Sequence, residues 1–235
     1  MSNYNGVIDE LIKGEWTNPE DQKKYGIPIK KIEIRKTLDG LEKDLIKSLH
    51  SDQRLLIVSD PFTHNAMGSR IFKNIKGKVN VDEYIWENPS SSIEGVEHLR
   101  EKIKDYDAMI AVGSGTVSDS IKYATFLEKK TYSVFATTPM NAYTTGTASI
   151  SFNGVKKSLV AHYAQGVFFD LEVLSNCPKR LTAAAFADVI CRTTAQVDWM
   201  MSHKLLETNY QSTPYSLLSL YEGDMIQSAS SIAEG

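Results

Sequence analysis

Residues 106–122 read YDAMIAVGSGTVSDSIK, and this stretch decides the fold. The short apolar run 108–112 ends in a glycine, which is typical of a buried strand in a parallel sheet. Small residues fill the turn 113–116, and helical spacing of apolar side chains follows at Val117, Ile121 and Ala124. We expect a helix to begin at Val117, so that a phosphate could approach backbone N–H groups at the positive end of the helix dipole.

The same alternation of strand and helix extends to both sides of this stretch. Helices are expected at 41–49, 65–75 and 96–106, and strands at 31–35, 55–59, 79–85, 131–137 and 166–170. Strands that alternate with helices of this length predict a parallel sheet with right-handed crossovers. Asn153-Gly154 joins 147–152 to 155–159 as a hairpin.

The ends of the chain differ from this central part. Residues 1–30 are expected to be a polar N-terminal extension, because Pro19, Gly26 and Pro28 break any long element. Residues 173–235 are expected to start an all-helical domain, because the patterning is only helical from Pro178 onward. Helices are predicted over 181–205, which no Gly or Pro interrupts, and over 215–233. The predicted fold class is α/β, with a Rossmann-like domain and a parallel sheet over 31–172, followed by the start of an incomplete all-helical domain.

Composition narrows the class of partner and the setting. The 235 residues are 42% hydrophobic and carry a formal net charge of −3, which argues against nucleic acid as an obligate partner. Two cysteines without CxxC spacing favour a reduced, cytoplasmic setting. We find no signal-peptide pattern and no apolar run of membrane-spanning length, so we expect a cytoplasmic protein without a membrane partner.

Three expected strand ends carry groups that suit a ligand, and in open α/β sheets ligands bind at that edge. The Asp60 carboxylate could accept hydrogen bonds from both ribose hydroxyls and repel a 2′-phosphate, which favours NAD over NADP, or it could simply start an Asp-Pro turn. The turn at 113–116 is neither GxGxxG nor a P-loop. Downstream of it, Asp119 could merely complement the helix dipole and Lys122 could be an exposed charge. The hydroxyl-rich segment 135–146 could bond a ribose or a carboxamide, or be an ordinary loop.

Five ordered blocks together resemble the glycerol-1-phosphate dehydrogenases of the dehydroquinate synthase and iron-containing alcohol dehydrogenase superfamily. They are GSGTVSDSIK (113–122), PMNAYTT (139–145), GVKKSLVAH (154–162), FFDLEVLSNCP (168–178) and AAAFADVICRTTAQVDW (183–199). Their order and spacing are similar to the family across about residues 31–205.

The resemblance implies a zinc- or nickel-dependent, NAD- or NADP-dependent reduction of dihydroxyacetone phosphate to glycerol 1-phosphate, a small-molecule reaction of phospholipid metabolism. Asn141 stands where the family usually has a substrate-contacting Asp, and it is implied as a catalytic residue together with Lys122. Asp188 matches the family's metal-ligating Asp. The implied cofactor contacts are Asp60, Gly113, Ser114, Gly115, Thr116, Val117, Asp119, Thr137, Thr138 and Thr145.

The sequence departs from the family at the expected metal site. The family's two metal-ligating histidines lie in a later helical segment, and none of this chain's five histidines stands in that motif. His162 is expected to be structural, and His203 lies fifteen positions after Asp188, about four helical turns away. The alternative for Asp188 is an i,i+4 ion pair with Arg192.

Three functional hypotheses therefore remain open. The first is a truncated, split or degraded polyol-phosphate dehydrogenase. The second is a catalytically incomplete NAD-binding remnant, or a half-protein that needs a partner chain. The third is a relative with other alcohol or dehydroquinate synthase-like chemistry. A partial helical domain would expose apolar side chains, so we expect a homo-oligomer or a complementing chain. The side chains concerned are Leu217, Leu218, Leu220 and Ile226.

Overall fold

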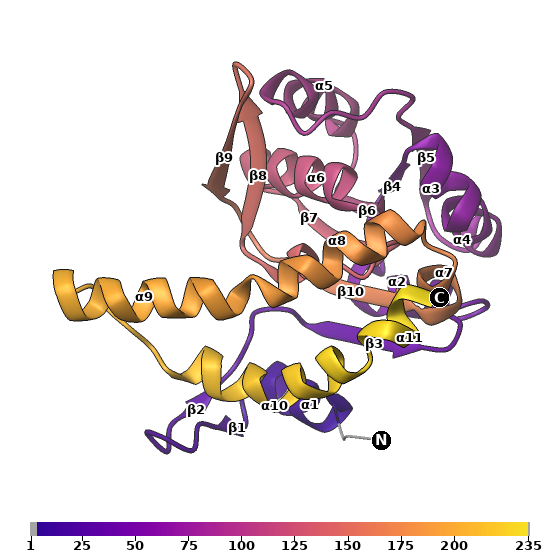
Figure 1. The fold of residues 1–235 in the computed structure, drawn as a ribbon. Coiled ribbons are helices and arrows are strands. Elements are labelled where there is room, and N and C mark those ends of the chain that lie inside the picture. The colour runs from indigo at the N-terminus through magenta and orange to yellow at the C-terminus, as the bar shows by residue number, and fades with distance from the viewer. Residues whose placement is uncertain (1–3, 235) are drawn as a thin grey trace.

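A six-stranded parallel sheet forms the centre of the chain in the computed structural model, which describes residues 4–234 (Figure 1). Its spatial order is β3-β10-β7-β6-β4-β5. The strands are β3 (Lys31–Arg35), β4 (Leu55–Ser59), β5 (Val81–Ile85), β6 (Ala108–Gly113), β7 (Thr131–Ala136) and β10 (Gly166–Asp170). The α/β class with a parallel sheet, predicted from the alternating pattern, is confirmed.

Helices cover both faces of the sheet. On one face α2 (Glu42–His50) and α4 (Ser69–Ile75) pack against alternate side chains of β4 and β6. On the other face lie α5 (Ile93–Ile103) and α6 (Gly115–Leu127). Because every residue of β4 and β6 is buried, these two strands read as continuous apolar runs rather than as an alternation.

Several element boundaries differ from the sequence prediction. Helix α6 begins at Gly115, two residues before the expected start, and α5 begins at Ile93. The helix expected from residue 65 starts directly after Asp60, as α3 (Pro61–Thr63) followed by a π-helical turn (His64–Gly68) and α4. The side chain of Asp60 caps this start, which explains why the helix begins early.

The hairpin predicted around Asn153-Gly154 is present as β8 (Thr147–Phe152) and β9 (Val155–Val160). Asn153 and Gly154 both adopt positive φ, as a two-residue turn between twisted strands requires. The hairpin stands beside α6, and Ala148 and Ile150 of β8 join the core on that face (Figure 1).

The expectation that no long element forms within residues 1–30 is wrong. Residues Tyr4–Lys13 form helix α1, and the short strands β1 (Trp16–Thr17) and β2 (Lys24–Tyr25) pair with each other. Trp16 is buried, and the Asn18 side-chain amide donates to the Thr213 hydroxyl at 2.7 Å. The proline and glycine positions end these elements instead of preventing them.

The chain after the sheet is all helical, as predicted. It comprises α7 (Leu171–Ser175), α8 (Lys179–Ile190), α9 (Arg192–Leu206), α10 (Thr213–Gln227) and α11 (Ala229–Glu234). The single helix expected over 181–205 is divided at Cys191, and the one expected over 215–233 at Ser228. Within residues 4–234, no helix is long and apolar enough to cross a membrane.

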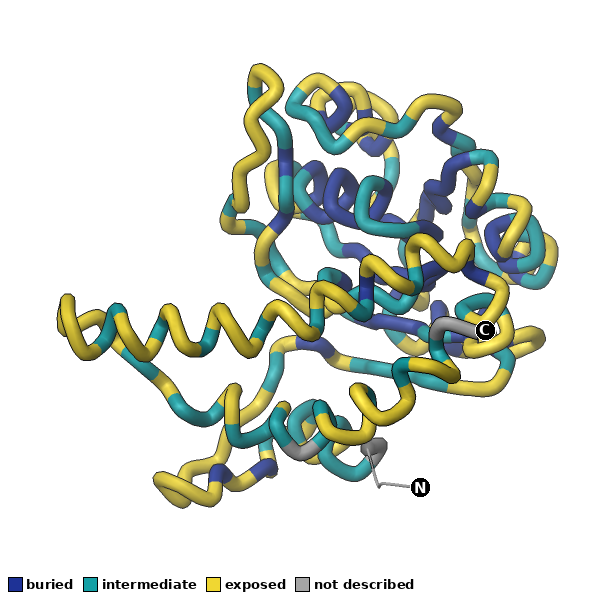
Figure 2. The backbone as a smooth tube through the Cα atoms, viewed as in Figure 1, coloured by how far each residue is buried: buried dark blue, intermediate teal, exposed yellow. Residues whose placement is uncertain are grey.

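Helix α9 extends away from the body of the molecule, and no side chain on it is buried (Figures 1 and 2). On α10, Leu218 and Ile226 are 43% and 53% exposed and Leu217 is half-buried, while the side chain of Leu220 lies outside the described residues. Apolar side chains are therefore exposed on these helices, in line with the expectation for Leu218 and Ile226.

Candidate functional site

A cleft of about 540 Å³ lies at the carboxyl edge of the sheet, above β4, β6 and β7. The helices that follow β4 and β6 lie on opposite faces of the sheet, so the topology reverses between these two adjacent strands. A crevice opens at such a reversal because the two connections leave in opposite directions. Pro178 and Leu181, at the start of α8, close the cleft from the other side.

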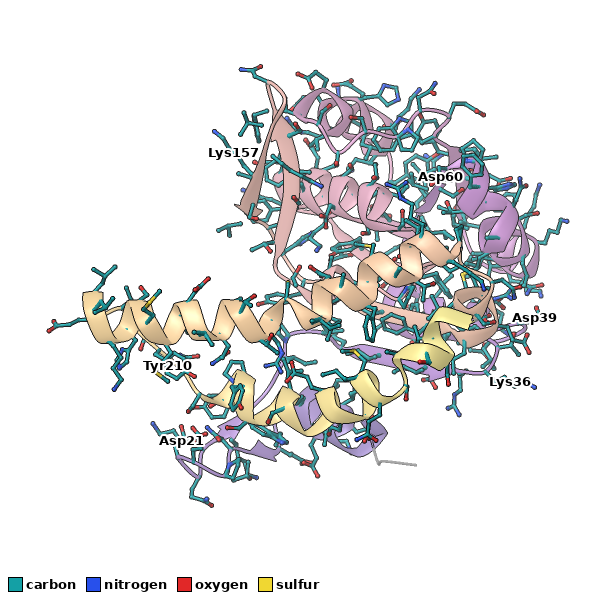
Figure 3. The ribbon with its side chains drawn as sticks, in the orientation of Figure 1. Asp21, Lys36, Asp39, Asp60, Lys157 and Tyr210 are labelled. Atoms are coloured by element: carbon teal, nitrogen blue, oxygen red, sulfur yellow. The ribbon has the colours of Figure 1, made fainter. Side chains whose placement is uncertain are left out.

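Asp60 lies in this cleft at the end of β4 (Figure 3). Its Oδ1 accepts hydrogen bonds from the N–H groups of Phe62 and Thr63, at 2.8 and 2.9 Å, and the Thr63 hydroxyl accepts from the Asp60 N–H. One carboxylate oxygen of Asp60 therefore serves the Asp-Pro turn that starts the helix, as the alternative interpretation of Asp60 expects. Both capping bonds go to Oδ1, which leaves Oδ2 uncommitted to the cap.

The turn after β6 is packed tightly against the first turn of α6. A Cβ atom on Gly113 would lie 2.7 Å from the Cβ of Val117, whereas one on Gly115 would meet the flexible end of Met140 at 3.0 Å. The first intrahelical bond runs from the Ser118 N–H to the Ser114 carbonyl, so the preceding N–H groups are free of the helix ladder. Within the described part of the chain, the Ser114 side chain makes no capping bond to them. The turn therefore offers backbone donors to an anion.

Thr137 and Thr138, directly after β7, line the same cleft. The Thr137 hydroxyl is buried without a hydrogen-bond partner among residues 4–234. The Thr138 hydroxyl lies 2.8 Å from the hydroxyl of Tyr143, which in turn donates to the Gly113 carbonyl at 3.0 Å. Two strand ends are thereby linked through one tyrosine.

Lys122 is fully buried, so the alternative of an exposed charge is wrong. Its ammonium donates to the Ala142 and Thr147 carbonyls at 2.8 and 2.9 Å, and to the Thr145 hydroxyl at 3.2 Å. It also lies 3.3 Å from the Asp119 carboxylate, whose second oxygen accepts from the Ser149 N–H. Burial lowers the pKa of Lys122. These residues fasten α6 to the loop before β8, and none of them lines the cleft above β4, β6 and β7.

Asn141 and Asp188 lie apart from that cleft. Asn141 lines a second cavity of about 500 Å³, together with Val189 and Arg192 of α8–α9 and Glu222 of α10. Asp188 is exposed. The expected ion pair between Asp188 and Arg192 is wrong, because Arg192 pairs with Glu222 instead.

The described residues hold only part of the donor set that a metal site needs. Among residues 4–234, no group of three or more His, Cys, Asp or Glu side chains could hold a metal ion. His203 bonds the Thr208 carbonyl at the far end of α9, and His162 bonds the Thr125 hydroxyl beside Tyr132, in line with a structural role. The described residues do not fit a zinc or nickel site.

Sequence reasoning missed most of the residues that line the cleft after β4 and in the segment before α8. Phe62, Asn176 and Cys177 line the cleft, and Tyr143 lies beneath it with its hydroxyl bonded to the Gly113 carbonyl. Phe62 is 86% exposed, which is unusual for a phenylalanine next to a proline turn. A large aromatic directly after the Asp-Pro pair was the available signal. Tyr143 gave no signal, because its role depends on a contact thirty positions away.

The family model described as "Iron-containing alcohol dehydrogenase" matches residues 33–178. That range holds the whole parallel sheet except the first two residues of β3, and it includes the cleft residues from the three strand ends. The chain belongs to the iron-containing alcohol dehydrogenase family.

Curated relatives agree with this family. The glycerol-1-phosphate dehydrogenase [NAD(P)+] of Pyrococcus abyssi is 32% identical over 186 residues, 78% of this chain and 53% of the relative. The enzyme of the same name from Haloarcula marismortui is 28% identical over 200 residues, 83% of this chain and 56% of the relative. The chain thus spans about half the length of the curated relatives it matches.

Solved structures share the fold. Glycerol dehydrogenase from Schizosaccharomyces pombe superimposes with a TM-score of 0.62 at 18% identity, over 69% of this chain and 42% of that one. A 2-deoxy-scyllo-inosose synthase, solved with carbaglucose-6-phosphate, NAD+ and Co2+, gives 0.58 at 14% identity, over 68% and 48% of the two chains. At these identities the likeness concerns the fold alone.

Proposed function

We propose that this chain is the cofactor-binding part of a glycerol-1-phosphate dehydrogenase-like oxidoreductase and binds NAD or NADP in the cleft above β4, β6 and β7. The observation that carries the proposal is the convergence of Asp60, Ser114, Thr137 and Thr138 from three strand ends on one cleft at a topological reversal. The glycerol-1-phosphate dehydrogenases among the relatives are named for NAD(P)+.

Each cleft residue has a distinct proposed role. The turn Gly113–Val117 would hold the pyrophosphate on its backbone N–H groups, and the Thr137 hydroxyl would gain the partner it lacks. The exposed ring of Phe62 would cover one face of the adenine. Oδ2 of Asp60 would accept from a ribose hydroxyl and repel a 2′-phosphate, so we expect NAD to bind more tightly than NADP.

We also propose a division of the chain at residues 30 and 172, and the following reaction for the whole protein. The bound nicotinamide would supply hydride for the reduction of dihydroxyacetone phosphate, and Asn141 would contact that substrate from the second cavity. Since the Lys122 amine already has four acceptors, we assign it to positioning the loop that carries Asn141 rather than to proton transfer. Asp188 would be a metal ligand only if other donors joined it.

The incomplete donor set favours a second candidate function, a nucleotide-binding unit that is not catalytic by itself. A second copy or a complementing chain would then supply the remaining metal ligands. Other superfamily chemistry, such as dehydroquinate synthase-like cyclisation, would use the same cofactor cleft with a different substrate.

Calorimetric titration with NADH and NADPH, each with and without zinc, tests the proposal. We expect saturable binding of both, with NADH tighter, and no dependence on zinc. Asp60→Asn keeps an oxygen for the helix cap but removes the negative charge. It should lower the ratio of NADH affinity to NADPH affinity by about tenfold. Asp52→Asn, before β4 at the opposite edge of the sheet, is the matched control. Absence of saturable nucleotide binding would overturn the proposal.

A further inference from the structure

The buried hydroxyl of Tyr143 connects two of the three strand ends below the cleft, those of β6 and β7. Tyr143 lies in a 3₁₀ turn (Ala142–Thr144) and is completely buried. Its Oη lies 3.0 Å from the carbonyl oxygen of Gly113, at the end of β6, and 2.8 Å from Oγ1 of Thr138, just after β7. No motif in the sequence assigns a role to this residue.

The direction of the two hydrogen bonds follows from the number of protons. A carbonyl oxygen can only accept, so the single phenolic proton of Tyr143 goes to Gly113. Thr138 must then donate to Tyr143, and its oxygen keeps lone pairs for other donors. Burial raises the pKa of Tyr143 to about 12, so the phenol keeps its proton at neutral pH.

Holding the Gly113 carbonyl also fixes the next N–H group. The carbonyl of Gly113 and the N–H of Ser114 belong to one planar trans peptide unit and point in opposite directions. The Gly113 carbonyl accepts from Tyr143 at 3.0 Å and from the Thr137 N–H at the longer distance of 3.5 Å, so the Ser114 N–H points away from Tyr143. The other side of the turn is fixed by the contact of Gly113 with Val117, where no Cβ would fit.

We propose that Tyr143 is a positioning residue of the nucleotide cleft, which sets the orientation of the Gly113–Ser114 peptide for a bound pyrophosphate and the orientation of Thr138. The inference rests on the proposed nucleotide-binding function. It adds that the anion site depends on a residue that does not itself touch the ligand.

Tyr132 provides a matched control for removal of this hydroxyl. It is also buried, near the amino end of β7, and its ring lies against His162 at 5.2 Å. Its hydroxyl has no hydrogen-bond partner within residues 4–234. Tyr132→Phe therefore removes the same atom from a buried ring away from the cleft.

The test compares NADH affinity of the full chain, Tyr143→Phe and Tyr132→Phe by calorimetry, with thermal unfolding of each. We expect Tyr143→Phe to weaken NADH binding about tenfold, or ~1.4 kcal/mol, while Tyr132→Phe binds like the unchanged chain. Equal NADH affinity of the unchanged chain and a folded Tyr143→Phe would overturn the inference. Absence of NADH binding by the unchanged chain would instead overturn the proposed function.

Two further measurements locate the effect. ADP-ribose contains the pyrophosphate but lacks the nicotinamide, so Tyr143→Phe should weaken its binding by the same factor as that of NADH. An unchanged affinity for ADP-ribose would contradict action through the turn. Thr138→Val removes the other hydroxyl of the pair, and the double variant should lose less affinity than the two single losses combined. If the two losses of affinity are fully additive, the two hydroxyls act independently, which would contradict the inference. If Tyr143→Phe does not fold, the test rests on Thr138→Val, and unchanged ADP-ribose binding by that variant would overturn the inference.

Discussion

The ammonium of Lys122 lies 2.9 Å from the carbonyl oxygen of Thr147, twenty-five residues further along the chain. Three more acceptors surround it, so one buried cation holds α6 against the segment between β7 and β8. Lys122→Met would remove the charged donor from the Ala142 and Thr147 carbonyls and would leave Asp119 without its cation. We expect it to lower the free energy of unfolding by about 3 kcal/mol, measured by urea denaturation.

Lys73→Met, at an exposed position on α4, is the control for Lys122→Met. It should change the free energy of unfolding by less than about 0.5 kcal/mol. A similar small effect of Lys122→Met would contradict the structural role assigned to Lys122.

We expect the two glycines of the turn, Gly113 and Gly115, to respond differently when each is replaced by alanine. Gly113→Ala places a Cβ 2.7 Å from the Cβ of Val117, a contact that the packed first turn of α6 cannot relieve. We expect a loss of about 2 kcal/mol in unfolding free energy and at least about tenfold weaker NADH binding. Gly115→Ala meets only the flexible end of Met140 and should keep its stability. Equal stability of the two variants would show that the turn is not packed as described.

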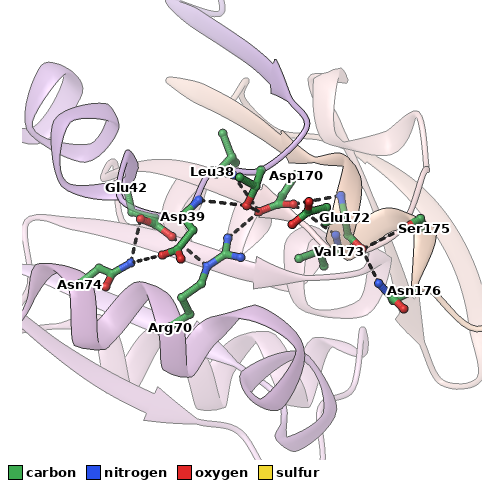
Figure 4. Close-up of polar contacts among 11 residues, drawn as sticks. Leu38, Asp39, Glu42, Arg70, Asn74, Asp170, Glu172, Val173, Ser175 and Asn176 are labelled. Carbon is green, nitrogen blue, oxygen red and sulfur yellow. Dashed lines mark hydrogen bonds and ion pairs between the residues drawn. The ribbon is translucent and has the colours of Figure 1, made fainter.

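Arg70 lies between two buried carboxylates, Asp170 and Glu42 (Figure 4). Although burial alone would raise the pKa of Asp170, hydrogen bonds from the Leu38 N–H and the Arg70 guanidinium outweigh it and hold this pKa below its usual value. A lowered pKa in the folded state stabilises the protein above the unfolded-state pKa of about 3.9, and this contribution is lost as the pH falls through the folded value.

Arg70→Met should therefore lower the free energy of unfolding by about 3 kcal/mol at neutral pH, with a smaller loss near pH 4, where Asp170 can take up a proton. Denaturation at a series of pH values measures this. Arg54→Met is the control, because Arg54 and Asp82 form an exposed pair worth less than about 1 kcal/mol. A loss that does not vary with pH would contradict the assignment.

The sequence predicted the elements whose pattern is local. The apolar runs of β4 and β6 and the Asn153-Gly154 turn indicated the sheet and the hairpin, because burial and turn geometry act over a few residues. The strand pattern itself placed Asp60, the turn 113–116 and the segment 135–146 at strand ends, and the family resemblance then implied individual cofactor contacts within them. Convergence itself followed from parallel topology, since all carboxyl ends meet at one edge.

The parts that were missed depend on long-range contacts. The burial of Lys122 results from acceptors twenty or more residues away, and neither charge nor spacing reveals them. Asp188 and Arg192 have the spacing of an i,i+4 pair, but Glu222 on α10 competes successfully for the guanidinium. The sequence does not indicate helix α1, because the proline and glycine residues that follow it argue against a long element in this region although they lie outside the helix.

The central claim is that the turn after β6 binds a phosphate group, and Ser114→Asp tests it most directly. An aspartate at position 114, the N-cap directly before α6, can cap the helix and interact favourably with its dipole, so we expect no loss of thermal stability. The same carboxylate would occupy the phosphate site and repel the negatively charged phosphate. Ser92→Asp, at the capping position of α5, is the matched control.

The decisive measurement is calorimetric titration of the unchanged chain, Ser114→Asp and Ser92→Asp with NADH. The account predicts saturable binding by the unchanged chain and by Ser92→Asp, and affinity at least about tenfold weaker for a stable Ser114→Asp. NADH binding by Ser114→Asp as tight as that of the unchanged chain would contradict it.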